Sequence, residues 1–76
     1  MASMAEKIKG ARRLRRLTQL ELAERAGVAQ SVVSKLERGT LTNPSTDVLR
    51  RLARALNVSM DYLAGLYDEV ETASVS

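Results

Sequence analysis

The chain has 76 residues, no cysteine, no histidine and a formal net charge of +3. This composition excludes a disulfide framework and the usual zinc sites, and the length predicts one small domain. No metal, cofactor or small-molecule ligand is evident from the sequence. No stretch approaches the roughly 20 apolar residues of a membrane span, and the N-terminus has no apolar signal segment, so we expect a cytoplasmic protein.

Charge is distributed unevenly along the chain. Residues 1–56 contain all twelve Lys and Arg against five acids, whereas residues 57–76 contain four acids and no base. A basic body is typical of proteins that bind a polyanion, although an ordinary solvated surface has the same composition. Charge alone therefore permits nucleic-acid binding without establishing it.

The first predicted helix covers residues 4–16. Ile8, Ala11 and Leu14 recur at helical spacing and are expected to face the core, while Lys and Arg crowd the rest of the helix. A basic amphipathic helix can also lie on an anionic membrane, but this one has no aromatic anchor and only a thin apolar stripe. We therefore favour a polyanion other than a membrane as its partner.

The stretch QLELAERAGVAQSVVSKLER is predicted to form two short helices, Gln19–Ala26 and Gln30–Arg38, joined by a tight turn. Thr18 and Glu21 have the spacing of a capping box, which fixes the start of the first of these helices. Gly27 stands at the turn, where glycine takes a positive φ without a steric penalty. This is the spacing of a helix-turn-helix, which places its second helix in the DNA major groove.

The second of these helices has an apolar and a polar face. Val33 and Leu36 point to the core, and the opposite face carries side chains that can hydrogen-bond base edges. Every surface helix has a polar stripe, but the position of this one in a helix-turn-helix favours base recognition. The start of the helix is expected to be slightly frayed, because Ala29 stands where a capping hydroxyl is expected. The residues expected to contact bases are Gln30, Ser31, Ser34 and Lys35.

Other residues are expected to contact the DNA backbone. A side chain at a helix N-terminus can clamp a phosphate with the help of the helix dipole, and the loop after the recognition helix offers hydroxyl and amide groups. Glu37 is expected to face inward and to form an ion pair with Arg12 that orients the helices. The expected phosphate contacts are Arg13, Arg15, Gln19, Thr40, Thr42 and Asn43.

Two more helices complete an all-α core in the sequence-based prediction. Ser45 caps a fourth helix that ends near Asn57, and Ser59 caps a fifth that ends near Leu66. Residues 1–66 are expected to form the helix-turn-helix domain, and residues 67–76 a C-terminal tail that is frayed or ordered only against a partner chain. The apolar residues expected in the core of these two helices are Val48, Leu49, Leu52, Ala53, Leu56, Val58, Met60 and Leu63.

From Ile8 to Leu66 the chain resembles the DNA-binding domain of the phage repressor and Cro (Xre-type) helix-turn-helix regulators. The resemblance rests on LTQLELAERAGV, VVSKLERG, the following NPS, and LRRLARALNVSMDYL, in that order and spacing. It implies a compact five-helix lambda-repressor-like bundle that binds a near-palindromic operator as a homodimer and most often represses transcription. It also implies that Gln19 contacts a phosphate, that Gln30 reads adenine, and that the Arg12–Glu37 pair is interior.

The chain departs from the family pattern at three positions. Ala29 replaces the usual hydroxyl cap, Arg16 stands where glycine is common, and Leu20 stands where a polar residue is usual. These departures concern helix ends and leave the expected fold unchanged. Dimerisation follows only from the resemblance, with an expected surface around the fifth helix formed by Tyr62, Leu66 and Tyr67.

Two other classes of function compete with a DNA-binding regulator. The acidic segment after Leu66 permits a protein-interaction module, such as an antitoxin with the same DNA-binding fold whose tail holds a toxin. The sequence does not support a catalytic function, because there is no His, no Cys and no pair of acids in an apolar cleft for acid–base or nucleophilic chemistry. The sequence favours a regulator that binds double-stranded DNA.

Overall fold

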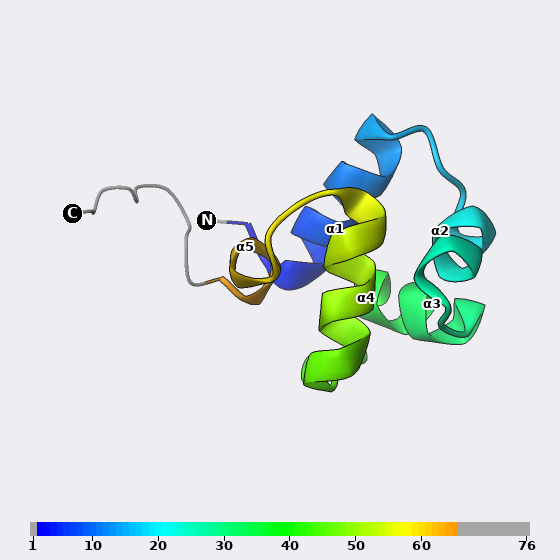
Figure 1. Cartoon of the computed structure of the whole chain (residues 1–76). Helices are drawn as coiled ribbons and strands as arrows, with labels where there is room; N and C mark the ends of the chain where they lie inside the picture. The colour runs from blue at the N-terminus through cyan, green and yellow to red at the C-terminus, as the bar shows by residue number, and fades with distance from the viewer. Residues whose placement is uncertain (1, 66–76) are drawn as a thin grey trace.

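The computed structural model describes residues 2–65, and these residues form the expected all-α bundle of five helices (Figure 1). Helices α2 (Gln19–Ala26) and α3 (Gln30–Arg38) have the predicted bounds. Helix α1 (Met4–Leu14) and helix α5 (Met60–Ala64) each end about one half-turn earlier than predicted. The helices are α1 (Met4–Leu14), α2 (Gln19–Ala26), α3 (Gln30–Arg38), α4 (Thr46–Leu56) and α5 (Met60–Ala64).

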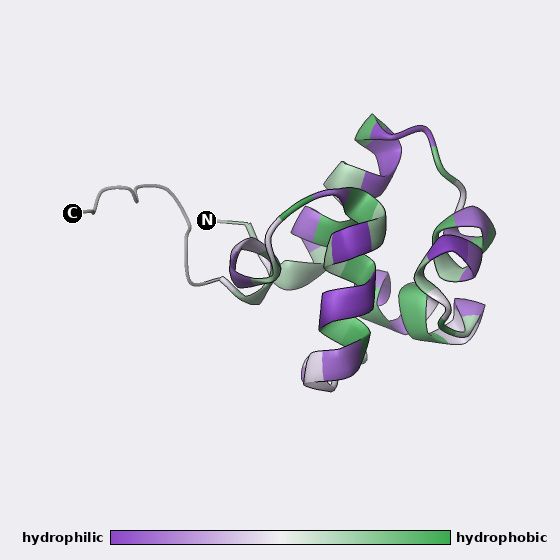
Figure 2. Cartoon of the chain, in the orientation of Figure 1, coloured by the Kyte–Doolittle hydropathy of each residue, from purple (hydrophilic) through white to green (hydrophobic). Residues whose placement is uncertain are grey.

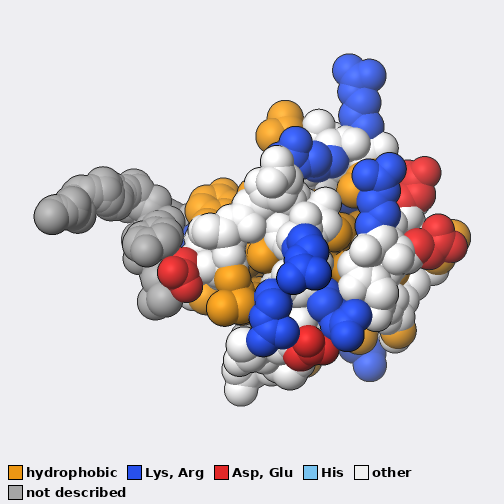
Figure 3. All heavy atoms as spheres, in the orientation of Figure 1, with side chains coloured by type: hydrophobic (Ala, Val, Ile, Leu, Met, Phe, Trp, Pro, Cys, Tyr) orange, Lys and Arg blue, Asp and Glu red, His pale blue; other side chains and the backbone are white. Residues whose placement is uncertain are grey.

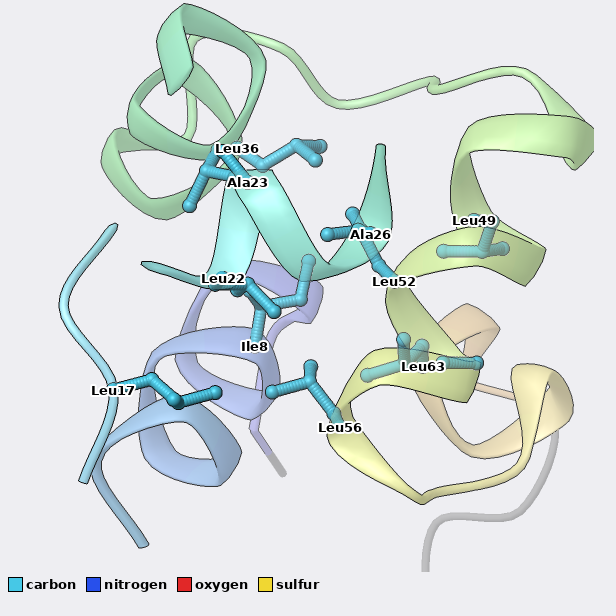
Figure 4. Packing of buried hydrophobic residues seen from close by; sticks show 12 residues of the cluster. Ile8, Leu17, Leu22, Ala23, Ala26, Leu36, Leu49, Leu52, Leu56 and Leu63 are labelled. Carbon is cyan, nitrogen blue, oxygen red and sulfur yellow. The ribbon is translucent and has the colours of Figure 1, made fainter. Parts of the chain in front are cut away.

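One cluster of apolar side chains from all five helices forms the core. Figure 2 shows hydrophobic and hydrophilic residues alternating around each turn of α4, as an amphipathic helix requires. In Figure 4 the side chains of Ile8, Leu22 and Leu56 approach one another between α1, α2 and α4. Val48, Val58 and Met60 are only half-buried against this cluster. The buried members are Ile8, Leu17, Leu22, Ala23, Ala26, Val33, Leu36, Leu49, Leu52, Ala53, Leu56 and Leu63.

Leu14 does not face the core, and that expectation was wrong. Its side chain is 77% exposed, whereas Leu17, three residues later, is only 7% exposed. At about 100° per residue, a position six residues after Ile8 lies well off the buried face. The helix also ends at Leu14, and the chain then turns so that Leu17 enters the core instead.

The turn after α1 contains a strained residue. Arg16 has a φ of +60°, a conformation that costs a residue with a side chain roughly 1 kcal/mol more than glycine. Its amide donates to the carbonyl of Arg13 at 2.9 Å, and the amide of Leu17 donates to the carbonyl of Arg12 at 3.1 Å. These two bonds satisfy helix-end carbonyls. The departure from glycine at residue 16 therefore falls on a position where the backbone favours glycine.

Helix starts follow their capping residues. The box predicted at Thr18 and Glu21 is present, with the Thr18 amide 2.8 Å from Glu21 Oε1. A second box joins Ser3 and Glu6 at the start of α1, and sequence reasoning missed it although the Ser-x-x-Glu spacing was there. Ala29 provides no side-chain cap for α3, as predicted.

Candidate DNA-binding site

The turn between α2 and α3 needs a residue without a side chain. Gly27 has a φ of +72°, and a Cβ added there would lie 3.1 Å from Arg51 Nη1. The amide of Val28 donates to the carbonyl of Ala23 at 3.0 Å, which closes the end of α2. Ala23 of α2 and Val33 of α3 are both buried in the core, where the two helices pack against each other. The structure therefore contains the helix-turn-helix predicted from the spacing.

The outer face of α3 is polar and open to solvent. The side chains of Gln30, Ser31 and Lys35 are exposed, and Ser34 is half-buried beside them. Within residues 2–65, none of these four side chains hydrogen-bonds another residue, so their donors and acceptors are available to a ligand. The opposite face of the same helix buries Val33, Leu36 and Glu37.

The loop after α3 and the end of α1 carry the other candidate residues. Arg13, Thr40, Thr42 and Asn43 are exposed. The hydroxyl of Thr40 donates to the carbonyl of Lys35 at 3.2 Å, so it helps to finish α3. Thr40, Thr42 and Asn43 follow α3 directly in the chain, and loops next to a helix-turn-helix commonly contact the DNA backbone.

Arg15, another expected phosphate contact, has an internal partner. Its Nε donates to the carbonyl of Leu56 at 2.8 Å, which ties the end of α1 to the C-terminus of α4. A cation is favourable there because the C-terminal end of a helix carries partial negative charge. Sequence reasoning missed this role because 41 residues separate the two partners.

Arg12 and Glu37 form a nearly buried ion pair. Arg12 Nε lies 2.6 Å from Glu37 Oε2, and Arg12 Nη2 lies 3.0 Å from Glu37 Oε1. The side chains are 13% and 2% exposed, respectively. Arg12 Nη1 also donates to the carbonyl of Leu17 at 2.8 Å. The pair thus joins α1, the turn after it and α3.

Both members of this pair are charged. Burial raises the pKa of the Glu37 carboxyl, but hydrogen bonds from Arg12 and Gln19, with the charges of Arg12 and Lys9, outweigh burial and leave the pKa below its ordinary value. The hydrogen bond to Glu37 raises the pKa of Arg12 against the opposing effect of burial. The carboxylate therefore stays ionised although it is buried.

Gln19 begins α2 and is half-buried rather than free in solvent. Its Nε2 donates to Glu37 Oε1 at 3.2 Å. The sequence predicted Gln19 as a phosphate contact and Glu37 as a partner of Arg12, but no local signal linked the two predictions. The structure brings Arg12, Gln19 and Glu37 into one hydrogen-bonded group.

Basic side chains also gather on α4. Figure 3 shows Lys and Arg side chains spread over the face that α4 presents to the viewer. Asp47 accepts hydrogen bonds from Arg51 at 2.8 Å and from Arg50 at 3.1 Å, and the bond from Arg51 is the main cause of its lowered pKa. These pairs are exposed and add little stability. They leave the face predominantly positive.

The expected dimer surface is described only in part. Tyr62 is 36% exposed, and Lys7 Nζ lies 4.9 Å from the centre of its ring. Lys7 Nζ also donates to the carbonyl of Tyr62 at 3.2 Å. Leu66 and Tyr67 lie outside the described residues.

The part of the chain that the structure describes offers neither a cluster of metal ligands nor a membrane-spanning helix. Residues 2–65 contain no group of three or more potential metal ligands. No helix in that range is long and apolar enough to cross a membrane.

A tight turn between two short helices, with a buried inner face and an open polar face on the second, defines a helix-turn-helix protein. The chain belongs to the helix-turn-helix family, because the family model described as "Helix-turn-helix" matches residues 8–63. That range contains all of α2, α3 and α4 and most of α1 and α5.

Individual relatives share this part of the chain. The HTH-type transcriptional regulator SinR of Bacillus licheniformis is 40% identical over 68 residues, which are 90% of this chain and 61% of that protein. A crystal structure of SinR, the master regulator for biofilm formation, in complex with DNA is 39% identical with a TM-score of 0.77, and the match covers 80% of this chain and 97% of that one. A crystal structure of the P22 c2 repressor in complex with a synthetic operator is 32% identical with a TM-score of 0.77. The match covers 83% of this chain and 94% of the repressor chain.

The chain spans about three-fifths of the length of SinR, so the match concerns one part of that longer regulator. The match therefore does not establish that this chain has the function of the whole SinR protein.

Proposed function

We propose that this protein is a sequence-specific DNA-binding regulator of transcription that acts as a repressor. The observation that carries the proposal is the open polar face of α3, the second helix of a helix-turn-helix. Relatives above 30% identity over most of the chain have been crystallised with DNA, which supports the same use of the fold here. DNA binding, rather than catalysis, is the function we assign, with the cytoplasm as the proposed location.

In this proposal α3 enters the major groove and reads base edges. Gln30 at its first turn pairs with adenine through its amide, and Lys35 reaches guanine or a phosphate. Phosphate contacts come from the ends of the helices and from the loop after α3. The assigned base contacts are Gln30, Ser31, Ser34 and Lys35, and the assigned phosphate contacts are Arg13, Arg15, Gln19, Thr40, Thr42 and Asn43.

We further propose that two copies bind a near-palindromic operator. A two-fold dimer would place its recognition helices about 34 Å apart, in successive major grooves. The proposed dimer contacts are Tyr62, Leu66 and Tyr67. The DNA-binding domain is proposed to end near residue 66, followed by a tail over residues 67–76. The exposed ring of Tyr62 supports this surface.

Replacing Gln30 by alanine tests the assignment of the recognition helix. Loss of a bidentate contact to a base is expected to weaken binding to the preferred site by roughly 1–3 kcal/mol and to relax specificity at one base pair of each half-site. Competition titrations against operators that carry every base at each position measure this loss.

Arg13→Ala is the matched control for that experiment. Arg13 is exposed on α1 and is assigned to the backbone, so its loss is expected to weaken binding by a similar factor on every sequence. If Gln30→Ala instead weakened binding equally on every sequence, as Arg13→Ala is expected to do, the assignment of α3 as the recognition helix would be wrong.

A further inference from the structure

The hydrogen bond between Gln19 and Glu37 fixes the orientation of an amide at the start of α2. An ionised carboxylate can only accept hydrogen bonds, so the amide nitrogen of Gln19, and not its oxygen, must face Glu37 Oε1. The lowered pKa of Glu37 keeps the carboxylate in that form. An amide nitrogen carries two hydrogens, and Glu37 Oε1 accepts only one of them.

We propose that Glu37 is a positioning residue that presents the second amide hydrogen of Gln19 to a DNA phosphate. The inference rests on the proposed function, because it assumes that α2 begins beside the DNA backbone. Gln19 is the first residue of α2, where unpaired backbone amides and the helix dipole also favour an anion. Glu37 therefore determines which end of the Gln19 amide meets the phosphate.

A carboxylate beside DNA would ordinarily repel it, and Arg12 removes that difficulty. Two hydrogen bonds from Arg12 neutralise the charge of Glu37, and burial keeps the carboxylate away from the surface. Arg12 is itself anchored to the carbonyl of Leu17, at the turn that leads into α2. The hydrogen-bonded group of Arg12, Gln19 and Glu37 fixes the start of α2 relative to α3. The phosphate contact at Gln19 and the base contacts of α3 therefore keep a constant position relative to each other.

The proposal predicts that Glu37 and Gln19 act together in DNA binding. Gln19→Ala is expected to weaken operator binding about tenfold, the size of one lost hydrogen bond to a charged group. Glu37→Gln is expected to weaken binding severalfold when Gln19 is present and to have no further effect in the Gln19→Ala background. Fluorescence anisotropy with one operator duplex gives the four dissociation constants, corrected for the folded fraction by circular dichroism.

The outcomes separate this inference from the proposed function. An equal effect of Glu37→Gln in both backgrounds would mean that Glu37 acts only through the fold. Unchanged binding by Gln19→Ala, with Gln30→Ala still impaired, would overturn the inference and leave DNA recognition standing. Absence of binding by the unmodified protein would instead overturn the proposed function.

A measurement on the unmodified protein covers the case in which Glu37→Gln does not fold. The two side-chain amide protons of Gln19 give separate NMR signals, and the one bonded to Glu37 is expected to keep its position when operator DNA is added. The other proton is expected to shift. Movement of both protons, or of neither, would contradict the proposed orientation.

Discussion

Replacing Leu52 by alanine is expected to remove about 2–5 kcal/mol from the free energy of unfolding. Leu52 is fully buried at the centre of α4, and Figure 4 shows its side chain in the cluster that joins α4 to its neighbours. A chain of this length has a total stability of roughly 4–11 kcal/mol at roughly 0.05–0.15 kcal/mol per residue. The variant therefore loses a large part of its stability, and urea denaturation followed by circular dichroism measures the change.

Leu14→Ala is the control for that loss. It makes the same chemical change at a leucine that is 77% exposed, so its cost is expected to stay within about 0.5 kcal/mol. Equal losses for the two variants would mean that the core is not where the structure places it.

Replacing Arg12 by methionine is expected to cost about 3 kcal/mol near neutral pH. The change leaves the carboxylate of Glu37 buried, with Gln19 as its remaining hydrogen-bond donor. Burial then outweighs the remaining favourable contacts, and the pKa of Glu37 rises above its ordinary value. Urea denaturation of both proteins over a range of pH measures the cost.

The sign of the pH dependence distinguishes the two proteins. In the unmodified protein the Glu37 pKa is lowered, so its contribution to stability is complete above the ordinary value of 4.5 and disappears as the pH falls through the lower folded value. In Arg12→Met the folded pKa is raised, so the penalty is relieved as the carboxyl takes up a proton. The stability difference is therefore expected to shrink from about pH 7 to about pH 4.

A second substitution controls for packing. Because a buried ion pair can often be replaced by apolar side chains at little cost, Arg12→Met with Glu37→Met is expected to recover much of the lost stability. A double variant no more stable than Arg12→Met would show that the loss comes from packing of Arg12 and not from an unpaired charge.

Much of the fold could be predicted because its signals are local. Thr18 with Glu21 fixes one helix start, Gly27 fixes a turn, and the apolar stripes of α3 and α4 identify their buried faces. The error at Leu14 arose from extending the apolar stripe beyond the residue where α1 ends. Helix ends depend on the turn that follows, and Arg16 gave no glycine signal there.

The candidate site could be predicted only in its separate parts. Residues on the outer face of α3 follow from its position in the helix-turn-helix, and the Arg12–Glu37 ion pair found in the structure agrees with the sequence-based expectation. The contacts of Gln19 with Glu37 and of Arg15 with Leu56 could not be predicted, because they join residues 18 and 41 positions apart in the chain. Such contacts are set by how the helices pack, which spacing does not give.

Selection of bound sequences from a random DNA pool, at about 50 mM and about 200 mM salt, tests the central claim most directly. A sequence-specific dimer predicts a two-fold symmetric motif with half-sites one helical turn apart, and weaker binding at the higher salt because phosphate contacts release counterions. Enrichment of no sequence, with binding lost at the higher salt, would contradict sequence-specific recognition by α3.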